Sequence, residues 1–274
     1  MSNIQIGLQL YSVRDKMQES VEDTLRAVKE MGYDYVEFAG YFDHTAEELK
    51  ALLEKYDLKC RSVHQVIDFY VEGGAEAVKF VKTLGTEFSV IPWYGKPNYI
   101  DGKMDGTVEL FAKVAKLLKE GGLEMLYHNH DFELDKYEDT TILDYILNNV
   151  PGMNPEFDTC WLKYAGYDPC KYLETYAGRY KVVHLKDFVC NELAAGPVYA
   201  LIDKDGKEAK PKSRDEMGFR FRPVGSGMQD IPAIIDAAIK GGAELFIVEQ
   251  DQSYEQDSLD AARESREYLR SIGY

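Results

Sequence analysis

Two of the five histidines of this 274-residue chain stand two positions apart in the segment YHNHDFE, residues 127–133. His128 and His130 follow an apolar run, and Asp131 and Glu133 come directly after them. Imidazole and carboxylate groups are common metal ligands and common acids and bases in enzymes. The segment therefore indicates either a polar strand end or part of a site, in which Glu133 could orient one of the two imidazoles.

Similar polar side chains follow the other apolar runs of the chain. His64, Asp158 and His184 each end such a run, as do Lys186, Asp187, Glu249 and Asp251, and the earlier runs end in Gln9 with Tyr11, Glu37, and Trp93. A set of one His or acid from each of four strands suits Mn, Co, Fe or Zn, and suits Mg less well. The alternative is a pocket lined by histidines and aromatic residues that binds no metal.

Strand-like and helix-like patterns alternate from one end of the chain to the other. The helical segments show apolar residues three or four positions apart, and Thr45 with Glu48 forms a capping-box pattern. The predicted strands are 4–11, 35–39, 60–64, 88–93, 124–130, 153–158, 181–187 and 245–251. Eight such units predict an α/β protein, a closed parallel (β/α)8 TIM barrel, in which residues at the carboxyl ends of the strands face one cavity.

The chain is expected to form a single domain over residues 1–274, with a long excursion at 188–229 over the barrel mouth. Within it, DKDG at 203–206 predicts a hairpin turn. The glycines of GSG at 225–227 are interpreted either as a phosphate-binding turn or as an ordinary turn. The basic run 207–214 either steers an anionic substrate or forms a solvated loop.

The composition argues against several classes of protein. With 48 acidic and 32 basic residues, the formal charge is −16, which argues against a nucleic-acid partner. The four cysteines form no CxxC pair and are expected to be free thiols in a reducing compartment. Because neither a signal peptide nor an apolar run of about 18 residues is found, we expect a cytoplasmic protein without a membrane partner.

Eight segments also carry a family resemblance in their order along the chain: LQLYSVRD, YVEFAG, SVH, YHNHDFE, FDTCW, HLKD, PVGSGMQDI and IVEQD. Together they resemble the sugar phosphate isomerase/epimerase family, the xylose isomerase-like TIM barrels. The resemblance implies a divalent metal held by one residue from each of strands five to eight. Asp158, His184 and Glu249 match the last three positions. The ketose epimerase branch has a glutamate on strand five, where we expect His128, with His130 as the alternate.

The resemblance implies a metal-dependent sugar isomerase/epimerase that acts on a sugar, keto-sugar or sugar phosphate by proton transfer through a metal-stabilised enediolate. Glu249 is the expected base, and Lys186 or His130 would stabilise the oxyanion. Epimerisation by two metal-bound glutamates is not expected, because only Glu249 is present in such a role. The expected substrate-binding residues are Gln9, Tyr11, Glu37, His64 and Trp93.

Three alternatives to an isomerase stay open at this point. They are an inosose dehydratase-like lyase, a keto-glycoside-cleaving enzyme, and a non-catalytic sugar-binding barrel, which would hold no stoichiometric metal. A repair nuclease of the endonuclease IV type is disfavoured by the acidic charge and by the five histidines. The expected partner is a small-molecule sugar, and the resemblance also allows a homodimer.

Overall fold

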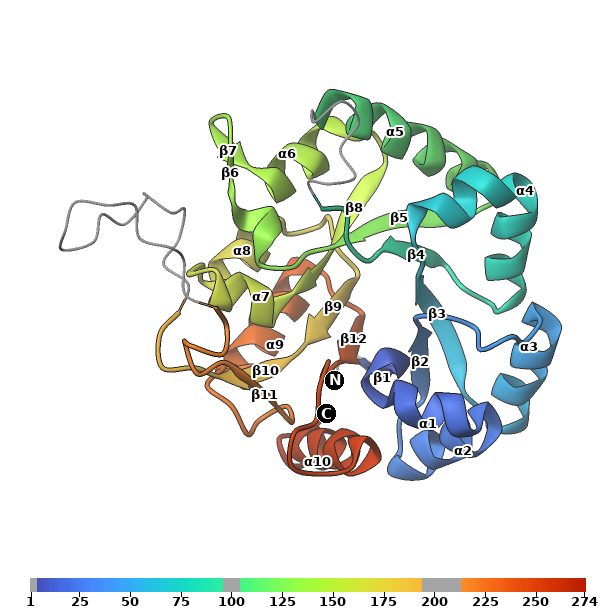
Figure 1. Ribbon diagram of the computed structural model, residues 1–274, viewed down its shortest axis with the longest axis vertical. Coiled ribbons are helices and arrows are strands. Elements are labelled where there is room, and N and C mark those ends of the chain that lie inside the picture. Colours follow the sequence, from blue (N-terminus) through green and yellow to red (C-terminus); the bar gives the residue numbers. More distant parts are fainter. Residues whose placement is uncertain (1–3, 96–103, 194–212) are drawn as a thin grey trace.

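Eight parallel strands form a closed barrel in the computed structural model, which describes residues 4–95, 104–193 and 213–274. Around the barrel, β1 is followed by β12, β9, β8, β5, β4, β3 and β2, which pairs again with β1. The predicted TIM barrel is therefore confirmed (Figure 1). The strands are β1 (Gln5–Gln9), β2 (Tyr35–Phe38), β3 (Lys59–His64), β4 (Phe88–Ile91), β5 (Glu124–His128), β8 (Met153–Asp158), β9 (Val182–Leu185) and β12 (Leu245–Val248).

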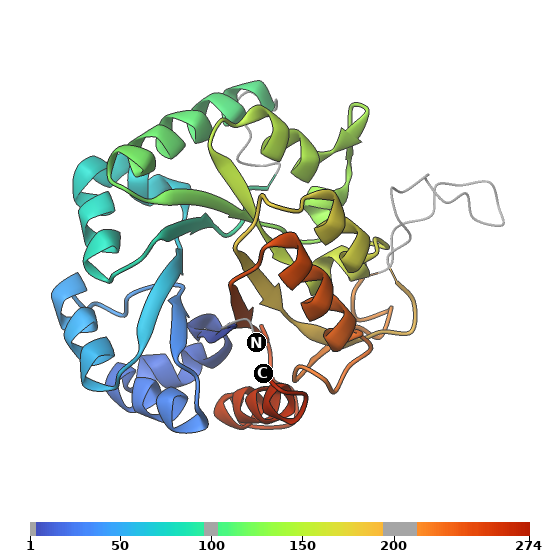
Figure 2. The same cartoon turned by 180° about the vertical axis from the view of Figure 1, so that it is seen from behind.

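Helices surround the barrel on its outside, as Figures 1 and 2 show from opposite directions. The predicted capping box is present, since Thr45 and Glu48 each accept a hydrogen bond from the other's backbone N–H at the start of α3. No helix in the described ranges is both long and apolar enough to cross a membrane. The helices are α1 (Arg14–Glu19), α2 (Val21–Met31), α3 (Ala46–Lys55), α4 (Ile67–Thr83), α5 (Met104–Glu120), α6 (Ile142–Asn149), α7 (Thr159–Tyr164), α8 (Pro169–Thr175), α9 (Ile231–Gly241) and α10 (Ser258–Ser271).

A layer of apolar side chains fills the middle of the barrel. Its buried members are Phe88, Val90, Leu126, Val182, Leu245 and Ile247, with Tyr35 packed against them. Gly7 allows β1 to approach this layer closely, because a Cβ at this position would lie 2.6 Å from Ile247 Cδ1. The layer closes the barrel from within and leaves the polar residues near the carboxyl ends of the strands as a separate layer.

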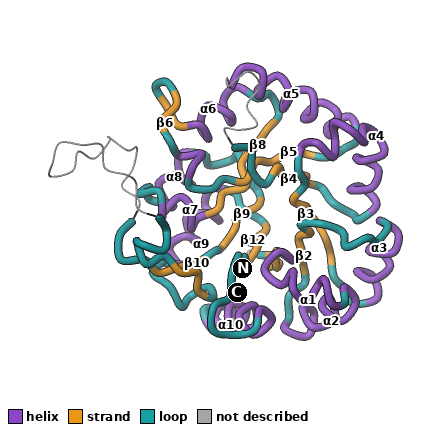
Figure 3. The backbone as a smooth tube through the Cα atoms, viewed as in Figure 1, coloured by secondary structure: helices purple, strands orange, loops and turns teal. Residues whose placement is uncertain are grey.

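Several strands end earlier than the sequence predicts. β1 ends at Gln9 and continues into a 3₁₀ turn, Leu10–Val13, and β5 ends at His128 rather than at residue 130. β12 ends at Val248, so that Glu249 and Asp251 follow the strand. β5 ends although its neighbour β8 continues to Asp158, because the Asn129 side chain, and not a backbone carbonyl group, accepts the Asp158 N–H. The backbone at the barrel mouth is therefore irregular, as the tube view shows (Figure 3).

The excursion after β9 begins with an antiparallel ribbon of β10 (Asp187–Val189) and β11 (Arg220–Arg222). Its aromatic residues pack on α7 in one buried cluster with Trp161 and Tyr164. The members from the excursion are Phe188, Met217, Phe219 and Phe221. The predicted DKDG hairpin and most of the basic run 207–214 lie outside the described residues. A further two-stranded ribbon, β6 (Lys136–Tyr137) with β7 (Thr140–Thr141), precedes α6.

Candidate active site

Four side chains from four different strands converge at the carboxyl end of the barrel. One ligand atom from each of His128, Asp158, His184 and Glu249 lies within 4.8 Å of the others, and all four residues are buried. His128 Nε2 lies 3.6 Å from Asp158 Oδ2, and His184 Nδ1 lies 2.9 Å from Glu249 Oε2. Two imidazoles and two carboxylates at this spacing are a suitable donor set for a divalent cation. We refer to these four residues as the outer set.

Lys186 lies beside the outer set and is almost completely buried. Its Nζ is 2.9 Å from Asp158 Oδ2, 2.9 Å from Glu249 Oε2 and 2.8 Å from Asp251 Oδ1. Burial opposes the charge on the ammonium group, but the three carboxylates together hold the pKa of Lys186 well above its ordinary value. The carboxylates around Lys186 outnumber its one ammonium group, so a dication bound beside them would be stabilised by the remaining negative charge.

A second group of buried residues lies against the outer set. His64 Nε2 is 2.7 Å from Glu156 Oε2 and 3.1 Å from Glu37 Oε2, and Gln9 Nε2 donates a hydrogen bond to Glu37 Oε2 at 2.7 Å. Glu37 Oε1 and Glu156 Oε1 are buried without a hydrogen-bond partner among the described residues. We call Glu37, His64 and Glu156 the inner layer.

The inner layer fixes the rings of the two outer-set histidines. His184 Nε2 lies 2.8 Å from Glu37 Oε2 and 3.2 Å from Glu156 Oε2, so that carboxylates face both of its nitrogens. His128 Nδ1 lies 3.3 Å from Glu156 Oε2. A carboxylate behind a ligating imidazole is the usual way in which a protein orients a metal ligand.

The charges of the two outer-set histidines and of the inner-layer carboxylates complement one another. Burial lowers the pKa of His128 to about 4, so its ring is neutral and donates from Nδ1 to Glu156 while Nε2 keeps a lone pair. Burial also disfavours a charged His184, but Glu156 and Glu37 hold the pKa of its ring well above its ordinary value. His184 therefore carries protons on both nitrogens, and a metal ion at Nδ1 would take the place of one of them.

Glu156 is the site residue that the sequence reasoning missed. It is fully buried and contacts three histidines of the site: His64, His128 and His184. A signal was available, because Glu156 precedes Asp158 by two positions in β8 and side chains two apart share one face of a strand.

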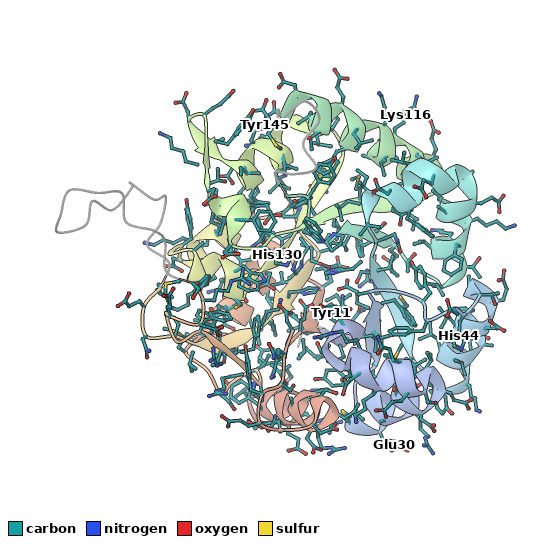
Figure 4. All side chains as sticks on the ribbon, in the orientation of Figure 1. Tyr11, Glu30, His44, Lys116, His130 and Tyr145 are labelled. Carbon is teal, nitrogen blue, oxygen red and sulfur yellow. The ribbon has the colours of Figure 1, made fainter. Side chains whose placement is uncertain are left out.

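The site opens into a cavity of about 540 Å³ at the barrel mouth. His64, Tyr11 and Trp93, which the sequence analysis expected to bind substrate, line this cavity, whereas Gln9 and Glu37 are fully buried and are not among the lining residues. Figure 4 shows Tyr11 and His130 towards the middle of the molecule and His44 at its edge beside α3.

His130, the alternative strand-five ligand, also lines the cavity but is not part of the outer set. It is also absent from the second group of potential metal ligands among the described residues, which is His64, His128, Glu156 and His184. The buried Nδ1 of His130 has no hydrogen-bond partner among the described residues. Burial and the neighbouring His128 hold the pKa of His130 well below its usual range, so the ring is neutral. The structure thus places His128 in the outer set and leaves His130 facing the space that a substrate would enter.

The structure distinguishes between two pairs of alternatives that the sequence left open. Glu133 accepts hydrogen bonds from the Tyr127 hydroxyl and from the backbone N–H of His130, not from an imidazole ring. The GSG turn does not offer free N–H groups to a phosphate, because Gly225 and Gly227 both donate to Asp187 Oδ2 at 3.0 Å. In both cases a carboxylate of the protein itself accepts the hydrogen bonds, and a short sequence motif does not show which acceptor its donors will meet.

The comparisons with known proteins agree with the barrel fold. The model of the family described as "Xylose isomerase-like TIM barrel" matches residues 25–272. The chain belongs to the xylose isomerase-like TIM-barrel family. This family assignment and the fold that it implies confirm the resemblance found in the sequence.

Individual proteins show similarity to this chain over nearly its whole length. An inosose dehydratase of Mesomycoplasma hyopneumoniae (strain 7448) is 24% identical over 304 residues, covering 99% of this chain and 97% of that protein. The structure of a sugar phosphate isomerase/epimerase from Parabacteroides distasonis ATCC 8503 matches with a TM-score of 0.76 at 19% identity, covering 100% and 96% of the two chains.

A D-allulose 3-epimerase from Methylomonas sp. matches with a TM-score of 0.67 at 15% identity, covering 99% and 98%. The family assignment agrees with the expectation of an enzyme. The two solved structures show that these proteins share the fold of this chain.

Proposed function

We propose that this protein is a divalent-metal-dependent isomerase or epimerase that moves a proton on a carbon next to a carbonyl group of a sugar or keto-sugar. The observation that carries the proposal is the convergence of the outer set at the floor of a cavity large enough for a small ligand. A bound dication held by these four residues would polarise the substrate's adjacent oxygens and stabilise the negative charge that develops when the proton leaves.

Glu249 is the base in this proposal. It lines the cavity and is 5% exposed, so it can reach both substrate and solvent. Burial favours its neutral form, but Lys186 and His184 hold the pKa of Glu249 well below its ordinary value, so it is ionised at neutral pH. A carboxylate that is ionised and close to the substrate carbon can accept its proton.

His130 is better placed than Lys186 to bind the developing oxyanion. Lys186 already contacts three carboxylates and is not among the residues that line the cavity. His130 lines the cavity with a neutral ring. A neutral imidazole can donate one N–H to a substrate oxygen, and in a buried site such a hydrogen bond stabilises negative charge more strongly than it does in water.

Elimination of water is the second candidate reaction, and the position of Asp251 favours it. Asp251 lines the cavity beside Glu249, and burial raises its pKa to about 6. Glu249 would take the proton from carbon, and Asp251 would protonate the departing hydroxyl group, so that a C–H and a C–O bond break, a C=C bond forms and water leaves. The similarity to inosose dehydratases supports the same candidate.

The substitution Glu249→Gln tests the assignment of the base. The variant keeps the size of the side chain but cannot accept a proton, so we expect a loss of at least ~100-fold in the rate of deuterium uptake from D2O into a responding keto-sugar. NMR of the wild-type reaction identifies the product and separates isomerisation from loss of water.

Glu120→Gln, an exposed glutamate at the end of α5, is the matched control and should react like the wild type. Deuterium uptake by Glu249→Gln at the wild-type rate would show that another group is the base.

A further inference from the structure

We infer that the substrate of this site is an uncharged sugar and not a sugar phosphate. The inference rests on the proposed function and narrows its substrate class. Three independent features carry it: the charges that line the cavity, the partners of the nearby cations, and the occupant of the glycine turn that most resembles a phosphate site.

The charges that line the cavity are acidic. Glu249 and Asp251 contribute carboxylates, and the described lining residues include neither lysine nor arginine. A phosphate group carries about −1.5 to −2 charges at neutral pH and is normally bound by Arg, Lys or several free backbone N–H groups. The two carboxylates would repel it, and the charge of the proposed dication would already be balanced by its ligands Asp158 and Glu249.

The cations nearest to the cavity already have anionic or carbonyl partners. Lys186 is enclosed by three carboxylates, as described above. Arg14 donates through Nη1 to the carbonyl oxygens of Tyr11 and Asp251, and its guanidinium group stacks on the Tyr11 ring at 4.1 Å. Arg214 donates to Asp131 and stacks on Trp161 at 4.2 Å. Within the described part of the chain, these groups would have to give up existing partners to bind a phosphate.

A protein carboxylate already fills the turn that could have bound a phosphate. Asp187 accepts four backbone hydrogen bonds, from Gly225 and Gly227 at its Oδ2 and from Gln229 and Phe188 at its Oδ1. The distances are 2.9–3.1 Å, and Asp187 is fully buried. Backbone N–H groups gathered in this way form an anion-binding nest, and here the anion is part of the chain.

The part of the cavity wall formed by the segments that follow β2, β3 and β4 is apolar. Val66 and Trp93 line the cavity with exposed fractions of 50% and 47%, and Phe69 and Tyr41 lie in the same lining. Sugars present an apolar face of C–H groups that packs well on aromatic rings, while their hydroxyl groups need hydrogen-bond partners. An apolar wall together with His64, His130 and Glu249 therefore matches an uncharged sugar.

Binding to matched pairs of ligands tests this inference. We would load the protein with Mg²⁺ and measure dissociation constants by ligand-observed NMR for D-fructose against D-fructose 6-phosphate, and for myo-inositol against myo-inositol 1-phosphate. Inorganic phosphate is titrated in parallel. In at least one pair the uncharged member should bind 10-fold or more tightly than its phosphate, and inorganic phosphate should not saturate.

Two variants make the comparison decisive. Val66→Lys adds a cation at an exposed position of the cavity wall and should gain measurable phosphate binding, which proves that the assay detects it. Trp93→Ala should weaken binding of the uncharged sugar by 5-fold or more. Tighter binding of a phosphorylated member, or saturable phosphate binding by the wild type, would overturn the proposed substrate class but not the proposed function. Absence of binding by every sugar would overturn the proposed function as well.

Discussion

The roles of individual residues in this site depend on which nitrogen of each histidine meets which carboxylate. His128 and His184 each direct one nitrogen to the outer set and the other to the inner layer. Such a ring is a better ligand than a freely rotating one, because its orientation is fixed before the metal arrives. Glu156 is central to this arrangement, although it does not belong to the outer set.

Glu156→Gln should weaken metal binding without abolishing it. The amide keeps the shape of the side chain but removes the charge that orients His128 and His184, and loss of such a partner typically costs about 10–100-fold in metal affinity. Competition with a chromophoric chelator measures the affinity, and elemental analysis should still find the wild-type stoichiometry.

Glu124→Gln is the control, since Glu124 begins β5 at the opposite end of the barrel. Unchanged affinity in Glu156→Gln would show that the inner layer does not orient the ligands.

The lowered pKa of His128 predicts how stability responds to acid. The unfolded chain binds a proton at this histidine near pH 6.5, whereas the folded chain does so only near pH 4. Between these values the unfolded state binds more protons, so His128 makes the free energy of unfolding fall by up to about 1.4 kcal/mol per pH unit as pH falls.

Urea unfolding of the metal-free protein at pH 7 and pH 5 measures this response. His128→Asn removes the titrating group, so the free energy of unfolding should fall less between pH 7 and pH 5 than it does in the wild type. An equal loss in both proteins would mean that His128 does not titrate as its burial indicates.

At the scale of elements, one carboxylate joins the beginning of the excursion after β9 to its end. Asp187 begins β10 and joins it to the turn at 225–229 through its four backbone hydrogen bonds. Gly227 is required at this point, because a Cβ there would lie 2.2 Å from Asp187 Oδ1. The aromatic residues of β10 and β11 then pack against α7 in the cluster around Trp161.

Asp187→Ala should destabilise the protein by about 3 kcal/mol, since it leaves several buried N–H groups without an acceptor and each such loss costs about 1–3 kcal/mol before relaxation. Chemical denaturation monitored by circular dichroism measures the change. Asp215→Ala, which removes an exposed partner of Arg220, should change the stability by less than about 1 kcal/mol. Equal effects of the two substitutions would show that the turn does not depend on Asp187.

At the scale of the whole molecule, the outer set joins four strands that are far apart in sequence. Residues 128, 158, 184 and 249 come from β5, β8, β9 and the end of β12, which are consecutive around the barrel. Only the folded barrel brings them together, so a metal ion bound there stabilises the folded state relative to the unfolded chain.

Addition of a divalent metal should therefore raise the thermal transition of the wild type. At a free metal concentration of 100 times the dissociation constant, the expected stabilisation is about 2.7 kcal/mol. Asp158→Ala removes one ligand of the outer set and should lose this response, while Asp139→Ala, a substitution outside the site, should keep it. Scanning calorimetry with MnCl2 and with EDTA measures the effect. A full response in Asp158→Ala would contradict the ligand assignment.

The sequence by itself determined the barrel and most of the outer set. Alternating strand and helix patterns require parallel strands, and parallel strands bring their carboxyl ends, with Asp158, His184 and Glu249, to one end of the molecule. These are consequences of local periodicity and need no knowledge of distant contacts. The metal, the base and the substrate class remain proposals for the experiments above.

The tertiary structure decided which polar groups meet. In the folded structure, β5 ends at His128 and Glu156 lies against three histidines. Lys186 lies among three carboxylates, and Asp187 accepts the backbone N–H groups of the glycine turn. Each of these contacts depends on the stagger between neighbouring strands and on where each strand ends, which are set by packing around the whole barrel. A local pattern shows which face a side chain occupies, but not which partner from another strand lies opposite it.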